Sequence, residues 1–212
     1  MISYKIHLLR TGSTVNDPEK LYVGQSDVPL SGRGRKTLKQ MAKELPYPLV
    51  EHVYTSPLVR CVQTAEILYP NYQPQLVEGL EDMNLGRFEG KSFDELRDDA
   101  YFTCWLEDSF NNTPPGGEKV LDFTQRTTAA FDGVVRQMMR DKVSDAAVVT
   151  HGGVIMALMA AIALPRLPIH QWASDNGSGY TLLTNTQMWL RDSCAEAFYL
   201  FPNEKDYPPT IS

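Results

Sequence analysis

Three short groups of residues, far apart along the chain, have side chains of the types that bind phosphate. They are Arg10-Thr11-Gly12, Ser56 with Arg60, and His151-Gly152-Gly153. An arginine guanidinium is planar and permanently charged, and it can donate two parallel hydrogen bonds to a phosphate group. A histidine adds a further donor or a base, and glycines let the backbone approach a ligand closely. Brought together, these groups would form a cationic pocket for a phosphate ester.

Each group follows a segment that we expect to be a buried strand. Short apolar runs at Tyr4–Leu9, Val50–Tyr54 and Ala146–Thr150 precede the three groups. Ligands of parallel sheets bind just beyond the carboxyl ends of the strands, so the three groups are expected at one edge. Ser56 is expected to N-cap a helix with Pro57 at its first position, and a second helix should follow Gly153. The N-termini of these helices would direct N–H groups at an anion.

Strands and helices alternate along the chain, which predicts an α/β fold: a three-layer sandwich with a mostly parallel central sheet flanked by helices. We expect a single domain over residues 1–212, with the irregular residues 79–117 forming a cap over the site. The other expected elements are strands Gln75–Val77, Tyr180–Leu183, Met188–Leu190 and Ala197–Leu200, and helices over residues 31–45, 56–69, 93–97, 101–107, 117–141 and 154–163.

Composition excludes several classes of protein. The 212 residues carry 20 Lys and Arg against 26 Asp and Glu, a net charge of −6, and 42% are hydrophobic, as in ordinary globular proteins. An acidic chain is a poor general ligand for nucleic acid, so we expect no nucleic-acid partner. The longest apolar run, of about 11 residues, is too short to span a membrane, and we expect no membrane partner.

The three cysteines form no CxxC pair, and the carboxylates lack metal-ligand spacing, so no metal and no cofactor are expected. The N-terminal residues lack the pattern of a signal peptide. These features favour a cytoplasmic protein with reduced thiols.

Together with their neighbours, the three groups resemble motifs of the histidine phosphatase superfamily, also called phosphoglycerate mutase-like proteins. Five motifs occur in the family order along nearly the whole chain, and this order carries the resemblance. They are Arg10-Thr11-Gly12-Ser13-Thr14-Val15-Asn16 with Gly24-Gln25-Ser26-Asp27 and Pro29-Leu30-Ser31, Ser56-Pro57-Leu58-x-Arg60-x-x-x-Thr64-Ala65, Leu80-x-Asp82-x-x-x-Gly86-x-Phe88-Glu89-Gly90, Pro114-Pro115-Gly116-Gly117-Glu118, and Thr150-His151-Gly152-Gly153.

The short spacing between Gly90 and Pro114 is similar to the compact phosphatase branch that includes α-ribazole phosphatase. The resemblance implies that a histidine after the first arginine attacks phosphorus and becomes phosphohistidine. Water or a second substrate then accepts the phosphoryl group. Cations stabilise the transferring group, and a carboxylic acid protonates the leaving oxygen.

Thr11 stands where the family has its nucleophilic histidine, and His7 lies inside the expected strand, out of register. A threonine hydroxyl is a much weaker nucleophile than imidazole unless a base activates it. The chain is therefore expected to be inactive or severely impaired as a phosphatase. Three explanations stay open: natural loss of turnover, deliberate replacement of histidine to trap a ligand, and turnover by an unusual route with His151 as base or nucleophile.

The resemblance assigns the remaining roles by position. Phosphate binding falls to Arg10, Asn16, Arg60 and His151, with His151 also among the catalytic residues beside Thr11 and Asp82. Asp82 matches the proton donor, and the adjacent Glu81 is the alternative, since alternation lets only one of the two face the pocket. The expected substrate rim consists of Gln25, Glu81, Gly152 and Ser178, the last in the loop that contains Asn176.

The expected ligand is a small phosphorylated metabolite or inorganic phosphate, and nothing in the sequence requires an oligomer. Two functions from different classes fit: a phosphomonoesterase, or a non-catalytic phosphate-ligand binder. Phosphoryl transfer of the phosphoglycerate mutase type is a third. The aromatic residues of the expected cap either stack on a leaving group or pack the short helices onto the core. They are Tyr101, Phe102, Trp105 and Phe110.

Overall fold

The computed structural model describes residues 2–202 and 205–206, which form one sheet of eight strands. The strand order is β3-β2-β4-β1-β6-β7-β5, and β8 pairs with β7. β1, β2, β3 and β4 are mutually parallel, β5 and β7 run in the same direction, and only β6 and β8 run opposite among the described strands. The bounds are Ser3–Arg10, His52–Thr55, Gln75–Leu76, Asp145–Thr150, Ala163–Leu164, Gly179–Asn185, Ala195–Phe201 and Lys205–Asp206 for β1 to β8. The predicted mostly parallel sheet is confirmed.

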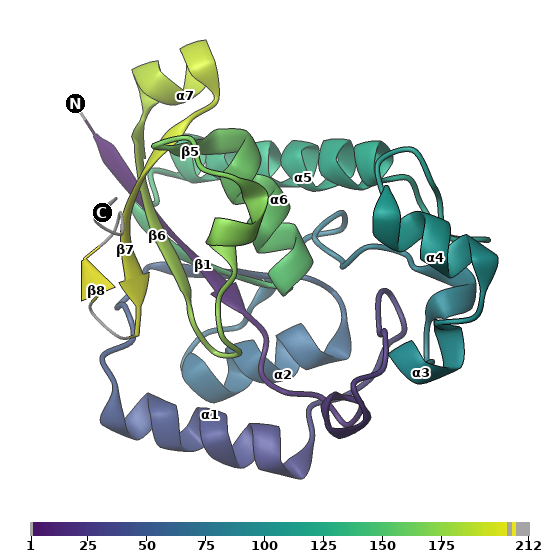
Figure 1. The fold of residues 1–212 in the computed structure, drawn as a ribbon. Helices are drawn as coiled ribbons and strands as arrows, with labels where there is room; N and C mark the ends of the chain where they lie inside the picture. Colours follow the sequence, from purple (N-terminus) through teal and green to yellow (C-terminus); the bar gives the residue numbers. More distant parts are fainter. Residues whose placement is uncertain (1, 203–204, 207–212) are drawn as a thin grey trace.

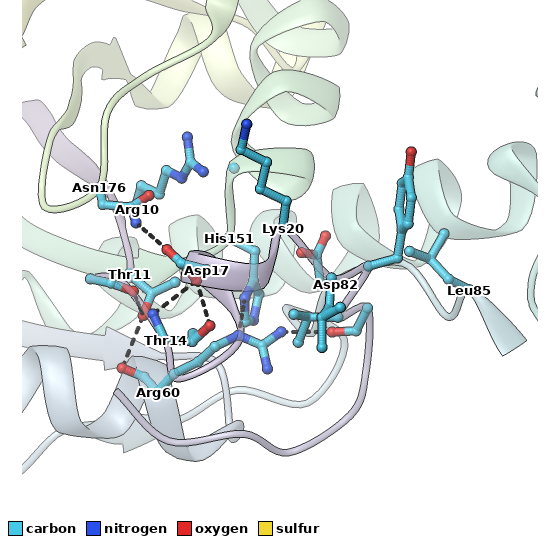
Figure 2. Close-up of a pocket in the computed structure, with 16 residues that line it drawn as sticks. Arg10, Thr11, Thr14, Asp17, Lys20, Arg60, Asp82, Leu85, His151 and Asn176 are labelled. Atoms are coloured by element: carbon cyan, nitrogen blue, oxygen red, sulfur yellow. Dashed lines mark hydrogen bonds between the residues drawn. The ribbon is translucent and has the colours of Figure 1, made fainter. Parts of the chain in front are cut away.

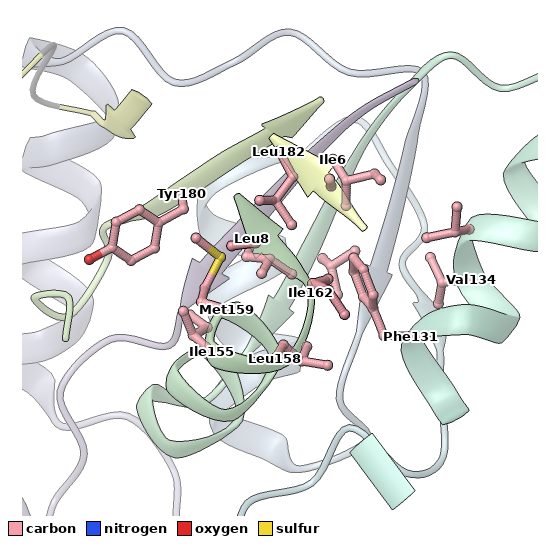
Figure 3. Close-up of a cluster of buried hydrophobic side chains, with 14 of the residues drawn as sticks. Ile6, Leu8, Phe131, Val134, Ile155, Leu158, Met159, Ile162, Tyr180 and Leu182 are labelled. Atoms are coloured by element: carbon pink, nitrogen blue, oxygen red, sulfur yellow. The ribbon is translucent and has the colours of Figure 1, made fainter. Parts of the chain in front are cut away.

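Helices cover both faces of this sheet (Figure 1). α1 (Gly32–Glu44) and α2 (Val59–Leu68) lie on one face, and α5 (Val120–Asp141) and α6 (Gly152–Ile162) lie on the other. Successive residues of a strand point to opposite faces, so β1 contributes to two cores. Ile6 and Leu8 pack with Ile155 and Leu158 of α6 (Figure 3), whereas Leu9 packs on the α1–α2 side. This three-layer arrangement confirms the predicted fold class.

The segment that the sequence marks as a cap contains three short helices and a small core of its own. They are η2 (Gly86–Phe88), α3 (Phe93–Leu96) and α4 (Ala100–Glu107). Phe88, Leu96 and Phe102 are buried together, with Trp105 packed against them. Tyr101 and Phe110 are exposed. Phe102 and Trp105 therefore pack within the cap segment rather than projecting to stack on a ligand.

The predicted strand Met188–Leu190 is wrong, because these residues lie in helix α7 (Thr186–Asp192). The Asn185 side chain accepts a hydrogen bond from the Met188 N–H at 2.9 Å and so caps the helix. The indole N–H of Trp189 donates to Asp132 at 2.8 Å, which holds α7 against α5. A three-residue apolar run cannot distinguish a strand from a short helix, and here the Asn185 N-cap favours the helix.

Ser56 does not cap α2 as predicted, since the helix begins only at Val59. The Asp27 carboxylate accepts from the Val59 N–H at 2.7 Å and takes the capping role from another part of the chain. Ser56 instead uses its hydroxyl on His151, at 2.9 Å from Nε2. The remaining predicted elements are present with bounds shifted by a few residues, and the described residues also include η1 (Asp17–Glu19) and η3 (Ile169–Trp172). In the described part of the chain, no helix has the length and apolar character needed to cross a membrane.

Candidate phosphate-binding site

The carboxyl ends of β1, β2 and β4 meet at one edge of the sheet and open into a cavity of about 430 Å³. Arg10 ends β1, Arg60 lies in the first turn of α2, and His151 joins β4 to α6. The three groups singled out in the sequence thus converge (Figure 2). The cavity is lined by Arg10, Thr11, Gly12, Thr14, Asp17, Lys20, Leu21, Tyr22, Val23, Gly24, Arg60, Asp82, Leu85, His151, Gly152 and Asn176.

Arg60 is buried and firmly held. Its Nε donates to His151 Nδ1 at 3.2 Å, Nη1 to the Ser26 carbonyl at 2.8 Å, and Nη2 to the Gly24 carbonyl at 2.6 Å. A guanidinium carries five N–H bonds, so two are left to bind an anion in the cavity. Among the described residues, no carboxylate forms an ion pair with it.

Arg10 lies across the first residue of α6. A Cβ atom on Gly152 would come within 3.2 Å of the Arg10 Cζ, so the glycine makes room for the guanidinium. Arg10 Nη1 donates to the Ser174 carbonyl. The N-terminus of α6 lies beside Arg10, and its first N–H groups contribute the positive end of a helix dipole to the cavity.

His151 is buried, and both of its ring nitrogens contact protein partners. Because Arg60 Nε donates to Nδ1, the ring proton lies on Nε2, which donates to the Ser56 hydroxyl at 2.9 Å. Burial, followed by the nearby Arg60 charge, holds the pKa of His151 well below its usual range. The imidazole is therefore neutral, and neither nitrogen is available as a base.

Thr11 points its hydroxyl away from any base. Its Oγ1 lies 3.0 Å from the Arg60 carbonyl and 3.1 Å from the Thr64 hydroxyl. Thr64 itself donates to the same Arg60 carbonyl at 2.7 Å, so the Thr11 proton is directed to a carbonyl or to a hydroxyl. Neither acceptor can remove a proton in a catalytic step, and the hydroxyl stays a neutral, weak nucleophile.

Asp82 is one of two carboxyl groups that line the cavity, with Asp17, and it lies above Arg60 in Figure 2. Burial raises its pKa, and Arg60 opposes this shift. Its Oδ1 accepts from the Met83 N–H at 3.0 Å. Glu81, the alternative proton donor, turns away: it accepts from the Gly79 N–H at 2.7 Å and pairs with Arg126 at 3.4 Å. A carboxyl with a raised pKa beside cations can donate a proton to a leaving oxygen.

Besides Glu81, three of the predicted residues lie outside this cavity. The backbone N–H of Asn16 donates to Thr14 Oγ1 at 3.3 Å, and Gln25 donates its backbone N–H to Glu89 at 2.9 Å. Ser178 lines a second cavity, on the other side of Arg10. Gly152 lies in the cavity as expected.

The sequence analysis missed the loop from Asp17 to Val23, which forms one wall of the cavity. Lys20 adopts a left-handed backbone with φ of 52° and lines the mouth of the cavity. The Asp17 carboxylate is held by donors, among them Thr14 N at 2.9 Å and Asn176 Nδ2 at 3.1 Å. The position of this loop between two motifs was the only signal for it. Within the described residues, no group of three His, Cys, Asp or Glu side chains could hold a metal ion.

Comparisons with known proteins agree with this geometry. The family model of the histidine phosphatase superfamily (branch 1) matches residues 6–193. Phosphoglycerate mutase-like protein 4 of Arabidopsis thaliana is 29% identical over 161 residues, which cover 73% of this chain and 69% of that protein. The Escherichia coli protein named "Probable phosphoglycerate mutase GpmB" is 28% identical over 134 residues, and the match spans 60% of this chain and 61% of that protein.

Solved structures show the same fold at lower identity. The alpha-ribazole phosphatase from Shigella flexneri superposes with a TM-score of 0.75 at 23% identity, covering 86% of this chain and 92% of that one. A phosphoglycerate mutase from Bacillus anthracis gives 0.76 at 18% identity, with 92% of each chain covered.

Proposed function

Because the chain belongs to the histidine phosphatase superfamily, we propose that it binds the phosphate group of a small phosphorylated metabolite and hydrolyses it very slowly or not at all. The binding half of this proposal rests on Arg10, Arg60 and Lys20. These three cations line one cavity, and within residues 2–202 none of them pairs with a carboxylate. In a protein of net charge −6, a cluster of cations that form no ion pairs favours an anionic ligand.

The observation that carries the catalytic half is the orientation of Thr11. Its hydroxyl faces the Arg60 carbonyl at 3.0 Å, and His151 has both nitrogens engaged elsewhere. Covalent phosphoryl transfer needs a strong nucleophile, and a neutral threonine hydroxyl is a weak one when no base can take its proton.

Hydrolysis of a phosphomonoester is the second candidate, and Asp82 favours it. Its carboxyl has a pKa raised by burial and lines the same cavity as Arg10 and Arg60. A chain that only binds phosphate has no need of a buried acid at this place. Apart from position 11, the groups needed for phosphatase chemistry are therefore present.

Thr11→His tests the proposal with 4-nitrophenyl phosphate as substrate. We expect turnover by the unchanged protein to lie near background, and Thr11→His to raise kcat/KM at least about 100-fold, since it restores a nucleophile. Thr11→Val is the matched control, because it keeps the shape of the side chain and removes only the hydroxyl.

Two results would count against the proposal. Turnover by the unchanged protein equal to that of Thr11→His would show that position 11 does not limit catalysis, and a large drop in Thr11→Val would show that the threonine hydroxyl reacts. Calorimetry with inorganic phosphate on the unchanged protein tests binding independently of whether Thr11→His folds. Absence of saturable binding would refute the binding half.

A further inference from the structure

Arg10 also forms one wall of a second cavity, of about 300 Å³, at the ends of β6 and β7. Its lining consists of Arg10, Ala173, Ser174, Asp175, Ser178, Leu200 and Phe201. Among the described residues, only Arg10 belongs to both cavities. Arg10 is therefore shared between the phosphate site and a space that the proposed function does not use.

The second cavity offers hydrogen-bond donors that have no protein partner. Ser174 is 9% exposed, and its buried hydroxyl has no hydrogen-bond partner among the described residues. Ser178 is 7% exposed, and in residues 2–202 only its backbone groups are hydrogen-bonded. Arg10 uses a single N–H, on the Ser174 carbonyl. A buried hydroxyl without a partner is unfavourable, and a bound acceptor would relieve it.

Charge and polarity define the ligand more narrowly. One guanidinium and two hydroxyls suit a carboxylate, which accepts hydrogen bonds at both oxygens. The exposed Asp175 carboxylate lies at the same cavity and disfavours a second negative charge on the ligand. Leu200 and Phe201 form the apolar part of the lining, which suits an apolar group on the ligand.

We propose that this cavity binds a small organic monocarboxylate with an apolar group, and that its occupancy weakens phosphate binding. The carboxylate would contact Arg10 and the hydroxyls of Ser174 and Ser178, and the apolar group would contact Leu200. Two anions on opposite sides of one guanidinium repel each other and share its donors, so the two sites are negatively coupled. The coupling is reciprocal: phosphate weakens carboxylate binding by the same factor.

Calorimetry with benzoate as the probe tests the site. Benzoate should bind saturably, and acetate, which lacks the ring, at least fivefold more weakly. Ser174→Ala combined with Ser178→Ala should weaken benzoate binding at least fivefold and leave phosphate affinity within twofold. Leu200→Ala, which alters neither serine, should weaken benzoate more than acetate. No saturable benzoate binding, or equal binding in these variants, would overturn the proposal.

Arg60→Met separates this proposal from the proposed function. It should abolish most phosphate binding and leave benzoate affinity within twofold, because Arg60 lines only the phosphate cavity. Loss of benzoate binding in Arg60→Met would mean that benzoate occupies the phosphate cavity, which refutes a second site. In the unchanged protein, saturating benzoate should weaken phosphate binding at least threefold, and at that same benzoate concentration the factor should be smaller in the double serine variant, which binds less benzoate. An unchanged phosphate affinity would refute the coupling.

Discussion

The two sides of the phosphate cavity use the same residue type in different ways. Arg60, on the side formed by α2 and the end of β4, is 2% exposed and donates to three separate acceptors. Arg10, on the side formed by the end of β1 and residues 173–178, is half-buried and donates to one carbonyl. The first guanidinium is fixed before a ligand arrives, whereas the second can change partners.

The difference lies in the guanidinium groups and not in the loops that surround them. The carbonyls that hold Arg60 belong to a loop fixed by Glu89, which accepts from Gln25 N at 2.9 Å and Ser26 N at 2.7 Å. The loop beside Arg10 is fixed too, since Tyr47 donates to the Gly177 carbonyl at 2.6 Å. A fixed cation contributes affinity without an ordering cost, and an adjustable one can couple two ligands.

The largest expected effect is on phosphate affinity. Arg60→Met should weaken binding of inorganic phosphate by about 100-fold, because a buried, pre-oriented charge is lost. Arg10→Met should cost about 10-fold, since that guanidinium is less firmly held before the ligand binds and part of its binding energy is lost in ordering it. Calorimetry at one ionic strength compares the two directly. Equal losses would break the distinction between a fixed and an adjustable arginine.

Stability should separate the two arginines in the same order. Arg60→Met leaves the Gly24 and Ser26 carbonyls and the His151 ring without a donor, so the free energy of unfolding should fall by about 3 kcal/mol. Arg10→Met should cost about 1 kcal/mol, the value of one hydrogen bond. Urea denaturation followed by circular dichroism measures both. A larger loss in Arg10→Met would contradict the structure of this side of the cavity.

The loss of folding stability at acid pH should also depend on the Arg60 side, because His151 lies there. The pKa of His151 is lowered in the folded state, so the unfolded state binds more protons and stability is lost as the pH falls below about 6.5. The loss approaches about 1.4 kcal/mol per pH unit for one proton. Stability curves of the unchanged protein and of His151→Gln between pH 7.5 and 5.5 should differ by this slope.

The difference between the two proteins is the quantity to use, because other groups titrate as well. The pKa of His7 is also lowered, chiefly by burial, and it adds an effect of the same sign. The pKa of Asp82 is raised, so its effect has the opposite sign: the stability that it contributes at low pH is lost as the pH rises through its folded-state pKa. Parallel curves for the two proteins would show that His151 does not contribute.

The smallest expected effect comes from Asn176, on the Arg10 side. Its amide donates to Ser13 Oγ at 2.8 Å and to the Asp17 carboxylate at 3.1 Å. Asn176→Ala removes a donor that compensates this carboxylate at the cavity wall, so phosphate affinity should fall by about threefold. Calorimetry measures the change, with Asn176→Ser as the conservative variant. A loss as large as that of Arg60→Met would place a main phosphate contact on the Arg10 side.

Much of the fold was predictable because its signals are local. Apolar runs mark the central strands, and cations and glycines directly after these runs place the site at one edge of the sheet. The order of five motifs predicted the histidine phosphatase superfamily, and the match over residues 6–193 confirms it. These inferences need only residue type and spacing along the chain.

The sequence-based predictions were wrong where a contact with another segment of the chain determines the local structure. Asp27 caps α2 from another segment, which frees Ser56 to bind His151. Asn185 converts an apolar triplet into helix α7. The phosphate contact predicted for Asn16 stays a prediction, since the described structure does not place it in the cavity lining, whereas Asp17 and residues 20–23 line the cavity without a motif of their own. In each case the contact is set by packing between elements.

The sequence alone determined which side chains are present at the edge of the sheet, including threonine at position 11 and acid at position 82. Only the tertiary structure decided what those groups can do. It directs the Thr11 proton toward the Arg60 carbonyl or the Thr64 hydroxyl, occupies both nitrogens of His151, and raises the pKa of Asp82 by burial. Hydrogen-bond direction and desolvation depend on neighbours that are distant in the chain, so residue order could not specify them.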